Sequence, residues 1–420
     1  MSSSATAADP GATPGVFRIG VLGRGTVGGA FAELVVEHAD RIQRITGLRP
    51  EVSGVLSRDS EPGAFERILA SCDLIAELIG GIEPARTYVL AAMRAGKHVV
   101  TANKQLLSQY GDELFATAGE HGVQLRFEGA VAGVVPVVRV LQESLAGARI
   151  ERVHGIVNGT TNYILSEMAR LGVTFEAALS EAQSLGYAEA DPTDDVDGAD
   201  AAAKMAIIAR LAFGAPVRLD QVRYEGIRRI TPDDMSYARE LGLALKLIGT
   251  AERVGEALSV RVHPAFLYPG HPLASIGGPF NAVTVESDAI TEITMSGPGA
   301  GGPQTATAVL GDVVSAMIPP ASAPEEMIEL PLAADVVSGF YLHLEVADES
   351  GVLAEVAQVL SNHDVSVKSV VQRGLGNQAR LVMVTHPVLE SQFFAATEEI
   401  SGLEALRAPP RAIRVIEEEF

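Results

Sequence analysis

An acidic segment that leads into an alanine-rich helix carries the residues best suited to chemistry. Six carboxylates lie between Glu189 and Asp200, and Lys204 follows them. The dipeptide Asp191-Pro192 imposes an extended or turned backbone, and the pattern of residues 198–213 predicts a helix. In that helix Asp200 and Lys204 are four residues apart and share one face. A carboxylate and an amine held side by side can bind an ammonium group and move a proton.

The same segment also has a purely structural interpretation. Asp197 would be the N-cap of the helix, and Asp200 would complete a pair resembling a capping box. The Asp200–Lys204 pair would then be an exposed ion pair, which contributes little to stability. The rest of the chain favours the chemical interpretation.

The composition indicates a globular protein with more than one domain. The chain has 420 residues, of which 47% are hydrophobic and 20% charged, and this length predicts two or three domains. A formal charge of −21 argues against nucleic acid or an anionic membrane as partner, because both bind basic surfaces. The single cysteine, Cys72, cannot form an internal disulfide. No apolar run is long enough to span a membrane, and residues 1–15 are expected to be a disordered tail in a cytoplasmic protein.

A glycine-rich turn near the N-terminus predicts a dinucleotide-binding domain. The apolar run of residues 17–22 ends in Gly23-Arg-Gly25-Thr26-Val27-Gly28, and a helical pattern follows. In this context Gly23 permits the tight turn, Gly25 the close approach of a pyrophosphate, and Gly28 the packing of helix on strand. The N–H groups at the start of the helix favour the anion. Further strands, expected at residues 52–56, 73–79, 97–101 and 123–127, predict a doubly wound parallel sheet.

The end of the second expected strand bears on the choice of dinucleotide. NAD-binding folds usually place a carboxylate there for the ribose 2′-hydroxyl. Here the strand ends in Leu56-Ser-Arg58-Asp59, in which Arg58 is placed to pair with a 2′-phosphate and Asp59 is one residue late. The alternative is that Arg58 is an ordinary surface arginine. The sequence therefore favours NADP over NAD and leaves the role of Arg24, within the glycine turn, open.

Three later segments follow expected strands of this sheet, where the carboxyl ends face a bound cofactor. Ile79-Gly80-Gly81 is a flexible loop suited to pass under a nicotinamide ribose. Thr101-Ala-Asn103-Lys104 places polar side chains toward a substrate, unless Asn103 only caps the next helix. Residues 128–136 form a turn bent by glycines, whose carbonyls suit a hard cation; the alternative is a buried turn between a strand and a helix.

The pattern changes after Pro136. Strands at 149–157, 243–250, 258–262, 282–285 and 291–295, with helices before Leu171 and from Phe175, predict a mixed α/β domain with one open sheet. The nine histidines show no ligand spacing, and His263 and His271, each before a proline, are interpreted as structural. Beyond residue 338 the order βαββαβ predicts a ferredoxin-like unit. The expected domains are 16–140, to which a helix at 303–317 returns, 141–302, a linker at 318–337, and 338–420.

Roughly the first 320 residues, about three quarters of the chain, closely resemble homoserine dehydrogenases. An ordered series of motifs carries the resemblance: Gly23-x-Gly25-Thr-Val-Gly28, Gly80-Gly81, Thr101-Ala-Asn-Lys104, Glu128 through Pro136, Asn158-Gly-Thr, Gly186-Tyr-Ala-Glu189-Ala-Asp-Pro, Asp195-Val-Asp-Gly-x-Asp200 with Lys204, and Gly297-Pro-Gly-Ala-Gly301. Residues 338–420 resemble an ACT domain, a regulatory module that binds amino acids.

The resemblance implies NAD(P)-dependent interconversion of L-homoserine and L-aspartate 4-semialdehyde, on the route to threonine, methionine and isoleucine. It makes Lys204 the acid/base supported by Asp200, places Lys104 near substrate and nicotinamide, and assigns substrate binding to Glu189, Asp195 and Asp200. It assigns a sodium ion to the carbonyls of Glu128, Val131, Gly133 and Val135. The expected cofactor contacts are Gly23, Gly25, Thr26, Val27, Gly28, Arg58, Gly80, Lys104, Gly186 and Gly301.

Partners follow from the same resemblance. A homodimer formed through residues 141–302 is expected, and pairing of the ACT-like domains would enlarge it to a homotetramer. Threonine is the expected effector, although Glu349-Ser350 stands where ACT domains often carry a basic residue and proline. The alternatives are a dehydrogenase of another short amino-acid aldehyde and a non-catalytic sensor of NAD(P) and amino acids. Glu189, Asp200 and Lys204 argue against the sensor, because a sensor needs no proton donor beside a nicotinamide.

Overall fold

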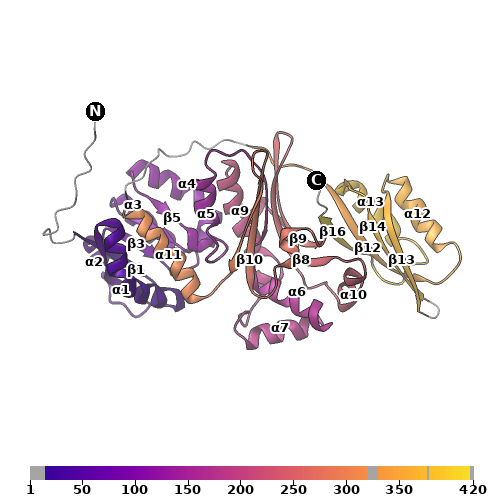
Figure 1. The fold of residues 1–420 in the computed structure, drawn as a ribbon, viewed down its shortest axis with the longest axis horizontal. Coiled ribbons are helices and arrows are strands. Elements are labelled where there is room, and N and C mark those ends of the chain that lie inside the picture. The colour runs from indigo at the N-terminus through magenta and orange to yellow at the C-terminus, as the bar shows by residue number, and fades with distance from the viewer. Residues whose placement is uncertain (1–14, 319–329, 376–377, 417–420) are drawn as a thin grey trace. The chain divides into compact units, whose positions relative to one another are not determined.

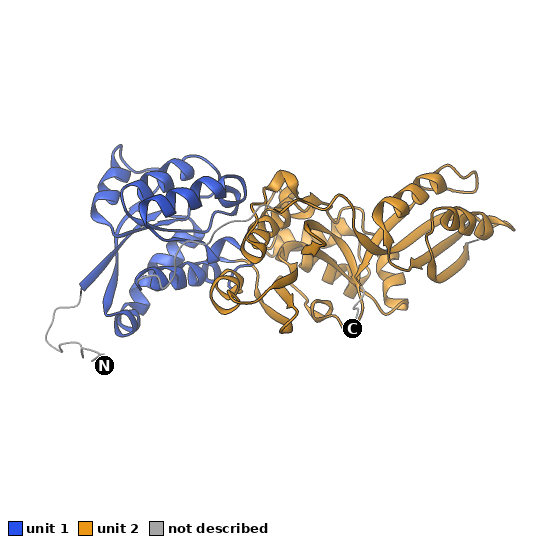
Figure 2. Cartoon of the chain, turned by 90° about the horizontal axis from the view of Figure 1, so that it is seen from above, with its two compact units in different colours: residues 1–134, 301–325 blue, residues 135–300, 326–420 orange. Residues whose placement is uncertain are grey.

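The computed structural model describes residues 15–318, 330–375 and 378–416. The chain divides into two compact units, coloured in Figure 2: unit 1 comprises residues 1–134 and 301–325, and unit 2 comprises residues 135–300 and 326–420. The predicted N-terminal tail and most of the predicted linker at 318–337 lie outside the described residues.

Unit 1 contains a parallel five-stranded sheet. Its strands are β1 (Gly15–Leu22), β2 (Leu48–Leu56), β3 (Leu74–Glu77), β4 (His98–Thr101) and β5 (Leu125–Arg126), in the order β2-β1-β3-β4-β5. Helices α1 (Thr26–Thr46) and α11 (Gly302–Ala316) pack side by side on one face of the sheet (Figure 1). Helix α2 (Ala64–Ser71) packs on β1 and β2, and helix α3 (Ala85–Arg94) packs on β3 and β4. Helix α4 (Lys104–His121) precedes β5. The predicted doubly wound parallel sheet is confirmed.

Helix α11 completes the core of unit 1 although it lies far along the chain. Alternate residues of β1, among them Ile19 and Val21, point toward Phe31 of α1 and toward Val309 and Val313 of α11, and all five are fully buried. Burying a side chain of this size contributes about 1.5–3 kcal/mol relative to leaving it exposed. The apolar face of α11 is therefore a substantial part of what holds the glycine turn and its strand in place.

Unit 2 begins with five antiparallel strands that match the predicted open sheet. They are β6 (Ile150–Ile156), β8 (Ala244–Val254), β9 (Ala257–Leu267), β10 (Phe280–Ser287) and β11 (Thr291–Pro298), in the order β11-β10-β6-β8-β9. Helices α6 (Gly159–Leu171) and α9 (Ala199–Phe213) pack on these strands, and α7 (Phe175–Ser184) and the short α8 (Thr193–Val196) lie between them in sequence. His263 and His271 are buried, as the structural interpretation requires.

A helix of unit 2 that was not predicted is α10 (Pro232–Glu240). It begins with a capping box, in which Thr231 and Asp234 satisfy each other's backbone N–H groups. Thr231-Pro-Asp-Asp234 is a sequence signature of a helix start, with proline at the first helical position. The signal for this helix was therefore present in the chain.

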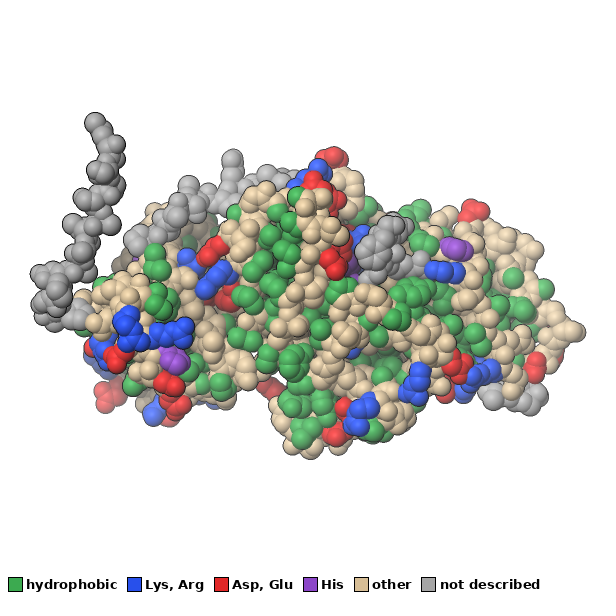
Figure 3. All heavy atoms as spheres, in the orientation of Figure 1, with side chains coloured by type: hydrophobic (Ala, Val, Ile, Leu, Met, Phe, Trp, Pro, Cys, Tyr) green, Lys and Arg blue, Asp and Glu red, His purple; other side chains and the backbone are tan. Residues whose placement is uncertain are grey.

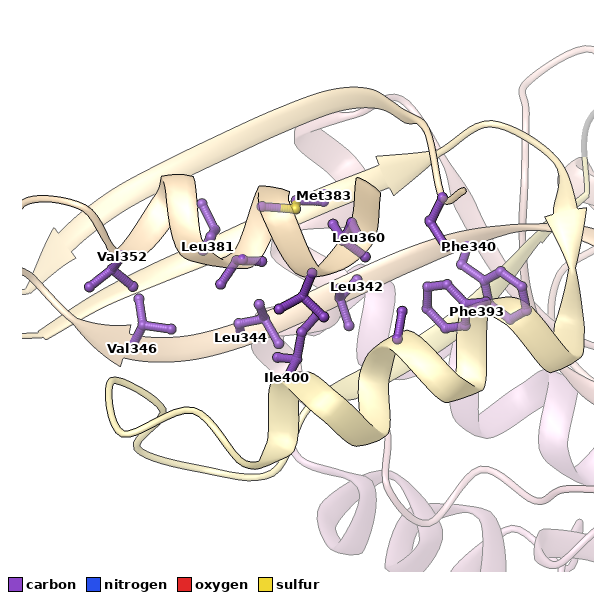
Figure 4. Packing of buried hydrophobic residues seen from close by; sticks show 14 of the residues in the cluster. Phe340, Leu342, Leu344, Val346, Val352, Leu360, Leu381, Met383, Phe393 and Ile400 are labelled. Carbon is purple, nitrogen blue, oxygen red and sulfur yellow. The ribbon is translucent and has the colours of Figure 1, made fainter. Parts of the chain in front are cut away.

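The C-terminal part of unit 2 has the predicted ferredoxin-like order. The elements are β12 (Val337–Ala347), α12 (Val352–Asn362), β13 (Val367–Leu375), β14 (Gln378–Thr385), the two-residue β15 (Val388–Leu389), α13 (Glu390–Ser401) and β16 (Arg411–Ile416). Figure 4 shows the apolar side chains that fill the space between the sheet and the two helices. Within this core the rings of Phe340 and Phe393 stack with centroids 3.7 Å apart.

A parallel strand pairing joins the two parts of unit 2. Strand β16 pairs with β9, with Arg414 opposite Ala265, so that one sheet continues in the order β9-β16-β12-β14-β13. Arg414 donates to both carboxylate oxygens of Glu390 and to Glu225, and only 12% of its side chain is exposed. A bidentate pair of this kind fixes geometry as well as charge. The elements from β12 to β16, named here the C-terminal module, are thus part of the same sheet as the preceding strands.

Two surface features bear on possible partners. In the part of the chain that the structure describes, no helix combines the length and apolarity needed to cross a membrane. On the face drawn in Figure 3, acidic and basic side chains are interspersed and form no continuous basic surface.

Candidate active site

The amine of Lys204 and the carboxylate of Asp200 form a buried pair on α9. Lys204 Nζ lies 2.8 Å from Asp200 Oδ2, and 12% and 2% of the two side chains are exposed. The N-cap of α9 is Gly198, with φ +91° and no side-chain cap, while Asp197 pairs with Arg228. The interpretation of Asp197 as the cap, with an exposed ion pair behind it, is therefore wrong. Gly198 takes the left-handed backbone that a carboxylate cap would not adopt.

Asn158 links this pair to a second carboxylate. Its Nδ2 donates to Asp200 Oδ2 at 2.8 Å and to Asp195 Oδ1 at 2.7 Å, while its Oδ1 accepts from the N–H of Thr161 and caps α6. Lys204 Nζ also donates to the carbonyl of Val157 at 2.7 Å. Buried charges are tolerated when they are paired and hydrogen-bonded in this way. Asn158 appeared in the sequence only as part of a motif, because its role depends on contacts 37 and 42 residues away.

The loop before α8 presents Glu189 to solvent. Thr160 Oγ1 donates to the carbonyl of Tyr187 at 2.6 Å and so ties the loop to the first turn of α6. Glu189 is exposed, and its carboxylate forms no hydrogen bond or ion pair with the residues that the structure describes. Gly186, also exposed, has φ +77°. Lys204, Asp200 and Asp195 therefore come together through Asn158, and the carboxylate of Glu189 does not join their network.

The glycine turn of unit 1 has the geometry that a pyrophosphate needs. Gly23 has φ +111°, and a Cβ there would lie 2.5 Å from the carbonyl oxygen of Leu78. A Cβ on Gly28 would lie 2.0 Å from the carbonyl oxygen of Gly23, whereas Gly25 has open space around it. Neither glycine at the closed positions can be replaced without moving backbone. The open one leaves room for a ligand to approach the main chain.

Two helix N-termini meet beside this turn. Thr26 and Val27 begin α1, which has no side-chain cap and no acidic residue in its first turn. Gly301 is the N-cap of α11, and a Cβ on Gly302 would lie 2.8 Å from Thr26 Cγ2. The unsatisfied N–H groups of both helices give this place a positive partial charge. The residues present therefore fit a dinucleotide pyrophosphate.

The end of β2 lies next to the glycine turn. The N–H of Gly23 donates to the carbonyl of Leu56 at 2.9 Å, and the exposed Arg58 follows two residues later. This places the Arg58 backbone near the turn, where the ribose of a dinucleotide is expected. Asp59 is also exposed.

A buried glutamate, not singled out from the sequence, organises the loop at residues 79–81. Glu77 is fully buried, and its Oε1 accepts from the N–H groups of Ile79 and Gly80 at 2.8 and 3.2 Å. Its Oε2 accepts from Thr101 Oγ1 at 2.5 Å. The sequence did contain a signal for this residue, because Glu77 stands inside the otherwise apolar run Leu-Ile-Ala-Glu-Leu-Ile. A carboxylate in a buried strand is almost never without partners.

Asn103 completes the same network. Its Oδ1 accepts from the N–H of Leu106 and caps α4, and its Nδ2 donates to the carbonyl of Gly81 at 2.6 Å. The interpretation of Asn103 as the cap of the next helix is confirmed, and the same amide also fixes the loop, while its orientation toward a substrate stays a prediction. Lys104 follows as the first residue of α4 and is partly buried.

The turn that was expected to hold a cation is sharply bent. Ala132 and Gly133 have φ +53° and +68°, and the N–H of Glu128 donates to Asp312 of α11 at 2.7 Å. The carbonyl of Glu128 accepts from the N–H of Val131, and the carbonyl of Val135 accepts from the N–H of Val137. Within the described residues, no group of three His, Cys, Asp or Glu side chains could hold a metal ion. A cation here would depend on main-chain oxygens.

Comparison with known proteins gives consistent matches along the chain. The family model described as homoserine dehydrogenase matches residues 136–314, its NAD-binding-domain counterpart matches residues 23–128, and the ACT domain model matches residues 341–405. The homoserine dehydrogenase of Corynebacterium glutamicum is 41% identical over 440 residues, covering 99% of each chain. That of Synechocystis sp. is 40% identical over 429 residues, covering 95% of this chain and 99% of its own.

Solved structures agree with these matches. A homoserine dehydrogenase from Thiobacillus denitrificans superposes with a TM-score of 0.89 at 37% identity and covers 96% of this chain and 100% of that one. A hyperthermophilic archaeal homoserine dehydrogenase in complex with NADPH superposes with a TM-score of 0.63 at 27% identity, covering 72% of this chain and 97% of that one. The likeness therefore extends over both units, and for the first of these structures over nearly the whole chain.

Proposed function

Since the chain belongs to the homoserine dehydrogenase family, we propose that Lys204 is its acid/base in the NAD(P)-dependent interconversion of L-homoserine and L-aspartate 4-semialdehyde. The observation that carries this assignment is the buried pair in which Lys204 Nζ lies 2.8 Å from Asp200. A lysine held by a carboxylate and by the carbonyl of Val157 is fixed in direction. Such an amine can give a proton to one oxygen and take it back.

The chemistry divides between the bound dinucleotide and the chain's own groups. The dinucleotide, when bound, supplies or accepts the hydride at C4 of its nicotinamide. In reduction, Lys204 as an ammonium donates its proton to the oxygen that was the aldehyde carbonyl and stabilises the negative charge that develops there. In oxidation, Lys204 as a neutral amine accepts the proton of the homoserine hydroxyl. Asp200 keeps the amine directed in both.

We assign the amino-acid end of the substrate to carboxylates of the acidic segment. Glu189 is exposed, and its carboxylate has no hydrogen bond or ion pair with the described residues, so the carboxylate is available for the α-ammonium group. Asp195 and Asp200 are fixed by the amide of Asn158 and add negative charge beside Lys204. Charge-assisted hydrogen bonds to an ammonium are about twice as strong as neutral ones.

We assign the dinucleotide to unit 1, with NADP preferred over NAD. Gly23, Gly25, Thr26, Val27, Gly28 and Gly301 surround the place where two helix N-termini meet, and Gly80 belongs to the loop fixed by Glu77. Arg58 supports NADP because a guanidinium binds a phosphate in a bidentate manner. Gly186, left-handed and exposed on unit 2, and Lys104, at the start of α4, are the remaining proposed contacts.

We also propose a structural sodium ion at the turn of residues 128–135. Its support is the bent main chain at Ala132 and Gly133, which turns successive carbonyl groups of this segment sharply over a few residues. The carbonyls of Val131 and Gly133 would complete the set, since hard cations prefer oxygen ligands. Replacing sodium by choline at constant ionic strength should lower the thermal midpoint of the protein. An unchanged midpoint would remove the proposal.

The catalytic proposal is tested by following absorbance at 340 nm with homoserine or aspartate 4-semialdehyde and each dinucleotide. Turnover is expected with both substrates, with a lower KM for NADP(H) than for NAD(H). A faster reaction with a longer or shorter amino-acid aldehyde would indicate another dehydrogenase. Dinucleotide binding without turnover of any of them would indicate a sensor.

The ACT domain at residues 341–405 suggests regulatory binding of a small molecule. We propose that the effector is threonine, which would make the enzyme subject to feedback, and that it assembles as a homodimer or homotetramer in the cytoplasm. Two features support the idea that effector binding at the ACT domain affects the preceding part of unit 2: the sheet that both parts share, and the contacts of β16 with the start of α10. Arg411 of β16 donates to Thr231 and Asp234 of α10 at 2.6 and 3.1 Å. Light scattering with and without threonine tests the assembly.

A further inference from the structure

A lysine outside the proposed catalytic set is buried in unit 2. Lys246 of β8 has 6% of its surface exposed, and it forms no ion pair with any residue that the structure describes. Its amine donates to Asn162 Oδ1 at 3.2 Å and to the carbonyl of Ile276. Burial lowers the pKa of Lys246 to about 8. Burying an ammonium group costs free energy unless it is hydrogen-bonded, so the two acceptors of Lys246 indicate what the residue does in the fold.

Both acceptors belong to one loop and the helix that holds it. The Nδ2 of Asn162 donates to the carbonyls of Ile276, Gly278 and Phe280, at 3.3, 3.0 and 3.1 Å. Because Nδ2 faces the loop, Oδ1 faces Lys246. Ser166 adds a further tie, since its hydroxyl accepts from the N–H of Gly278 at 3.2 Å. The loop of residues 276–280, named here the 276–280 loop, is thus bound to α6 through Asn162, with Lys246 behind it.

The 276–280 loop touches the start of α6. A Cβ on Gly159 would lie 2.7 Å from the carbonyl oxygen of Pro279, so the two main chains are in direct contact there. Asn158 directly precedes Gly159, caps α6 and holds Asp195 and Asp200 through its amide. A displacement of the loop therefore reaches these carboxylates through one residue.

We propose that Lys246 is a positioning residue for the amino-acid substrate: through Asn162 and the 276–280 loop it fixes Asn158, and Asn158 fixes Asp195 and Asp200. The inference rests on the proposed substrate site. Charge-assisted bonds from one ammonium to the loop carbonyl and to Asn162 hold the loop more rigidly than a neutral side chain would. Lys246 itself touches neither Asp195 nor Asp200 among the contacts of the described residues, so its influence on binding passes through the loop.

The kinetic test compares Lys246→Met with the parent enzyme and with Lys246→Arg. Losing charge-assisted bonds should raise the KM for homoserine about tenfold. The KM for NADP should change less than twofold, because the dinucleotide is assigned to unit 1. Lys246→Arg, which keeps a charged donor, should recover part of the loss. Lys368→Met, at a lysine of β13, is the matched control and should behave like the parent.

A double-mutant cycle separates positioning from general destabilisation. In an Asn158→Ala background, Lys246→Met should add little to the KM for homoserine, since the path through Asn158 is already broken. Additive effects on that KM would overturn the proposal. So would equal increases in the KM for homoserine and for NADP.

Hydrogen exchange supplies a measurement that does not depend on turnover. In Lys246→Met without ligands, amides in residues 158–163 and 276–280 should exchange about tenfold faster, while those of residues 15–56 should not change. Unchanged exchange in both segments would refute the positioning role even if the catalytic proposal stands. Lack of turnover in the parent enzyme would refute the catalytic proposal alone. If Lys246→Met does not fold, the same exchange measurement is made on Lys246→Gln, which is uncharged but retains a donor. Faster exchange in residues 158–163 and 276–280 would then support the positioning role, and unchanged exchange would refute it.

Discussion

At the residue scale, the buried Lys204–Asp200 pair has two separable effects. The amine is the proposed proton carrier, and it also compensates the charge of a carboxylate whose side chain is 2% exposed. Removing one partner of a buried pair leaves an uncompensated charge, which commonly costs about 3–5 kcal/mol of stability. A loss of activity at Lys204 therefore has to be distinguished from a loss of folded protein.

We expect Lys204→Ala to lower kcat by about 10²–10⁴-fold, the usual contribution of a positioned acid/base. Dinucleotide affinity, measured by fluorescence titration of NADPH, should stay within about twofold because its proposed phosphate site lies in unit 1. The double variant Asp200→Asn with Lys204→Ala removes both charges and should regain stability without regaining activity. Near-normal turnover in either variant would exclude the assignment.

A second expectation concerns pH and Lys246. Burial lowers its pKa from 10.5 to about 8. Below pH 8 the lysine is protonated in both the folded and the unfolded chain. Between pH 8 and 10.5 only the unfolded chain holds the proton, so stability contributed by this residue rises with pH in that window.

The measurement is urea unfolding of the parent and of Lys246→Met at pH 7.5 and 9.5. The free energy of unfolding of the parent, relative to the variant, should increase by about 2 kcal/mol between the two values. Taking the difference between the two proteins cancels groups that titrate in both. A difference that is constant with pH, or that falls, would mean that the pKa of Lys246 is not lowered.

At the element scale, the turn between α8 and α9 is packed against a neighbouring segment. A Cβ on Gly226 would lie 2.1 Å from the carbonyl oxygen of Val196 and 2.4 Å from the Cα of Asp197. The N–H of Ile227 donates to that same carbonyl at 2.8 Å. Main chain thus contacts main chain directly before the helix that carries Asp200 and Lys204.

Gly226→Ala is therefore expected to displace the start of α9. We expect a loss of about 1–3 kcal/mol in stability, as for other overpacked sites. The value of kcat/KM for homoserine should fall more than that for NADP. Gly147→Ala is the matched control, because a Cβ at Gly147 has no atom within 4 Å. Equal behaviour of the two variants would show that the turn tolerates the displacement.

Sequence patterns gave most elements but not the contacts between them. The strands of both sheets and the face shared by Asp200 and Lys204 follow from local periodicity, which depends on nearby residues. Asn158 and Glu77 were missed because their roles depend on partners brought close by folding. Helix α10 was missed although Thr231 and Asp234 form a capping box. The pairing of β9 with β16 joins strands about 150 residues apart, and no local pattern encodes such a register.

At the scale of the whole molecule, the continuous sheet of unit 2 bears on regulation. Strand β16 covers the edge of β9, and Arg411 reaches from it to Asp234 of α10. Burial alone would raise the pKa of Asp234, but its hydrogen bond with His343 and the charge of Arg411 bring it below the ordinary value. A shift of β16 would therefore alter the ion pair between Arg411 and the buried Asp234, which lies on the preceding part of unit 2.

We expect L-threonine to inhibit homoserine oxidation, and deletion of residues 338–420 to abolish that inhibition. The deletion also uncovers the edge of β9, so circular dichroism must show that the variant is folded. Arg411→Gln keeps the C-terminal module and breaks its bonds to Thr231 and Asp234. It should weaken inhibition while leaving the uninhibited rate within about twofold. Full inhibition of a folded deletion variant would exclude the C-terminal module as the route.

The position of α11 has a consequence for the order in which the protein is made. Unit 1 needs Val309 and Val313 for its core, yet the ribosome adds them only after more than 160 residues of unit 2 have been synthesised. Domains commonly fold during synthesis, with the N-terminal one first. Until α11 has been made, the nascent N-terminal sheet has only α1 on this apolar face and the rest of the face is uncovered, so residues 135–300 can fold before unit 1 is complete. Arrest of translation before residue 300 should leave the glycine turn unable to retain a dinucleotide.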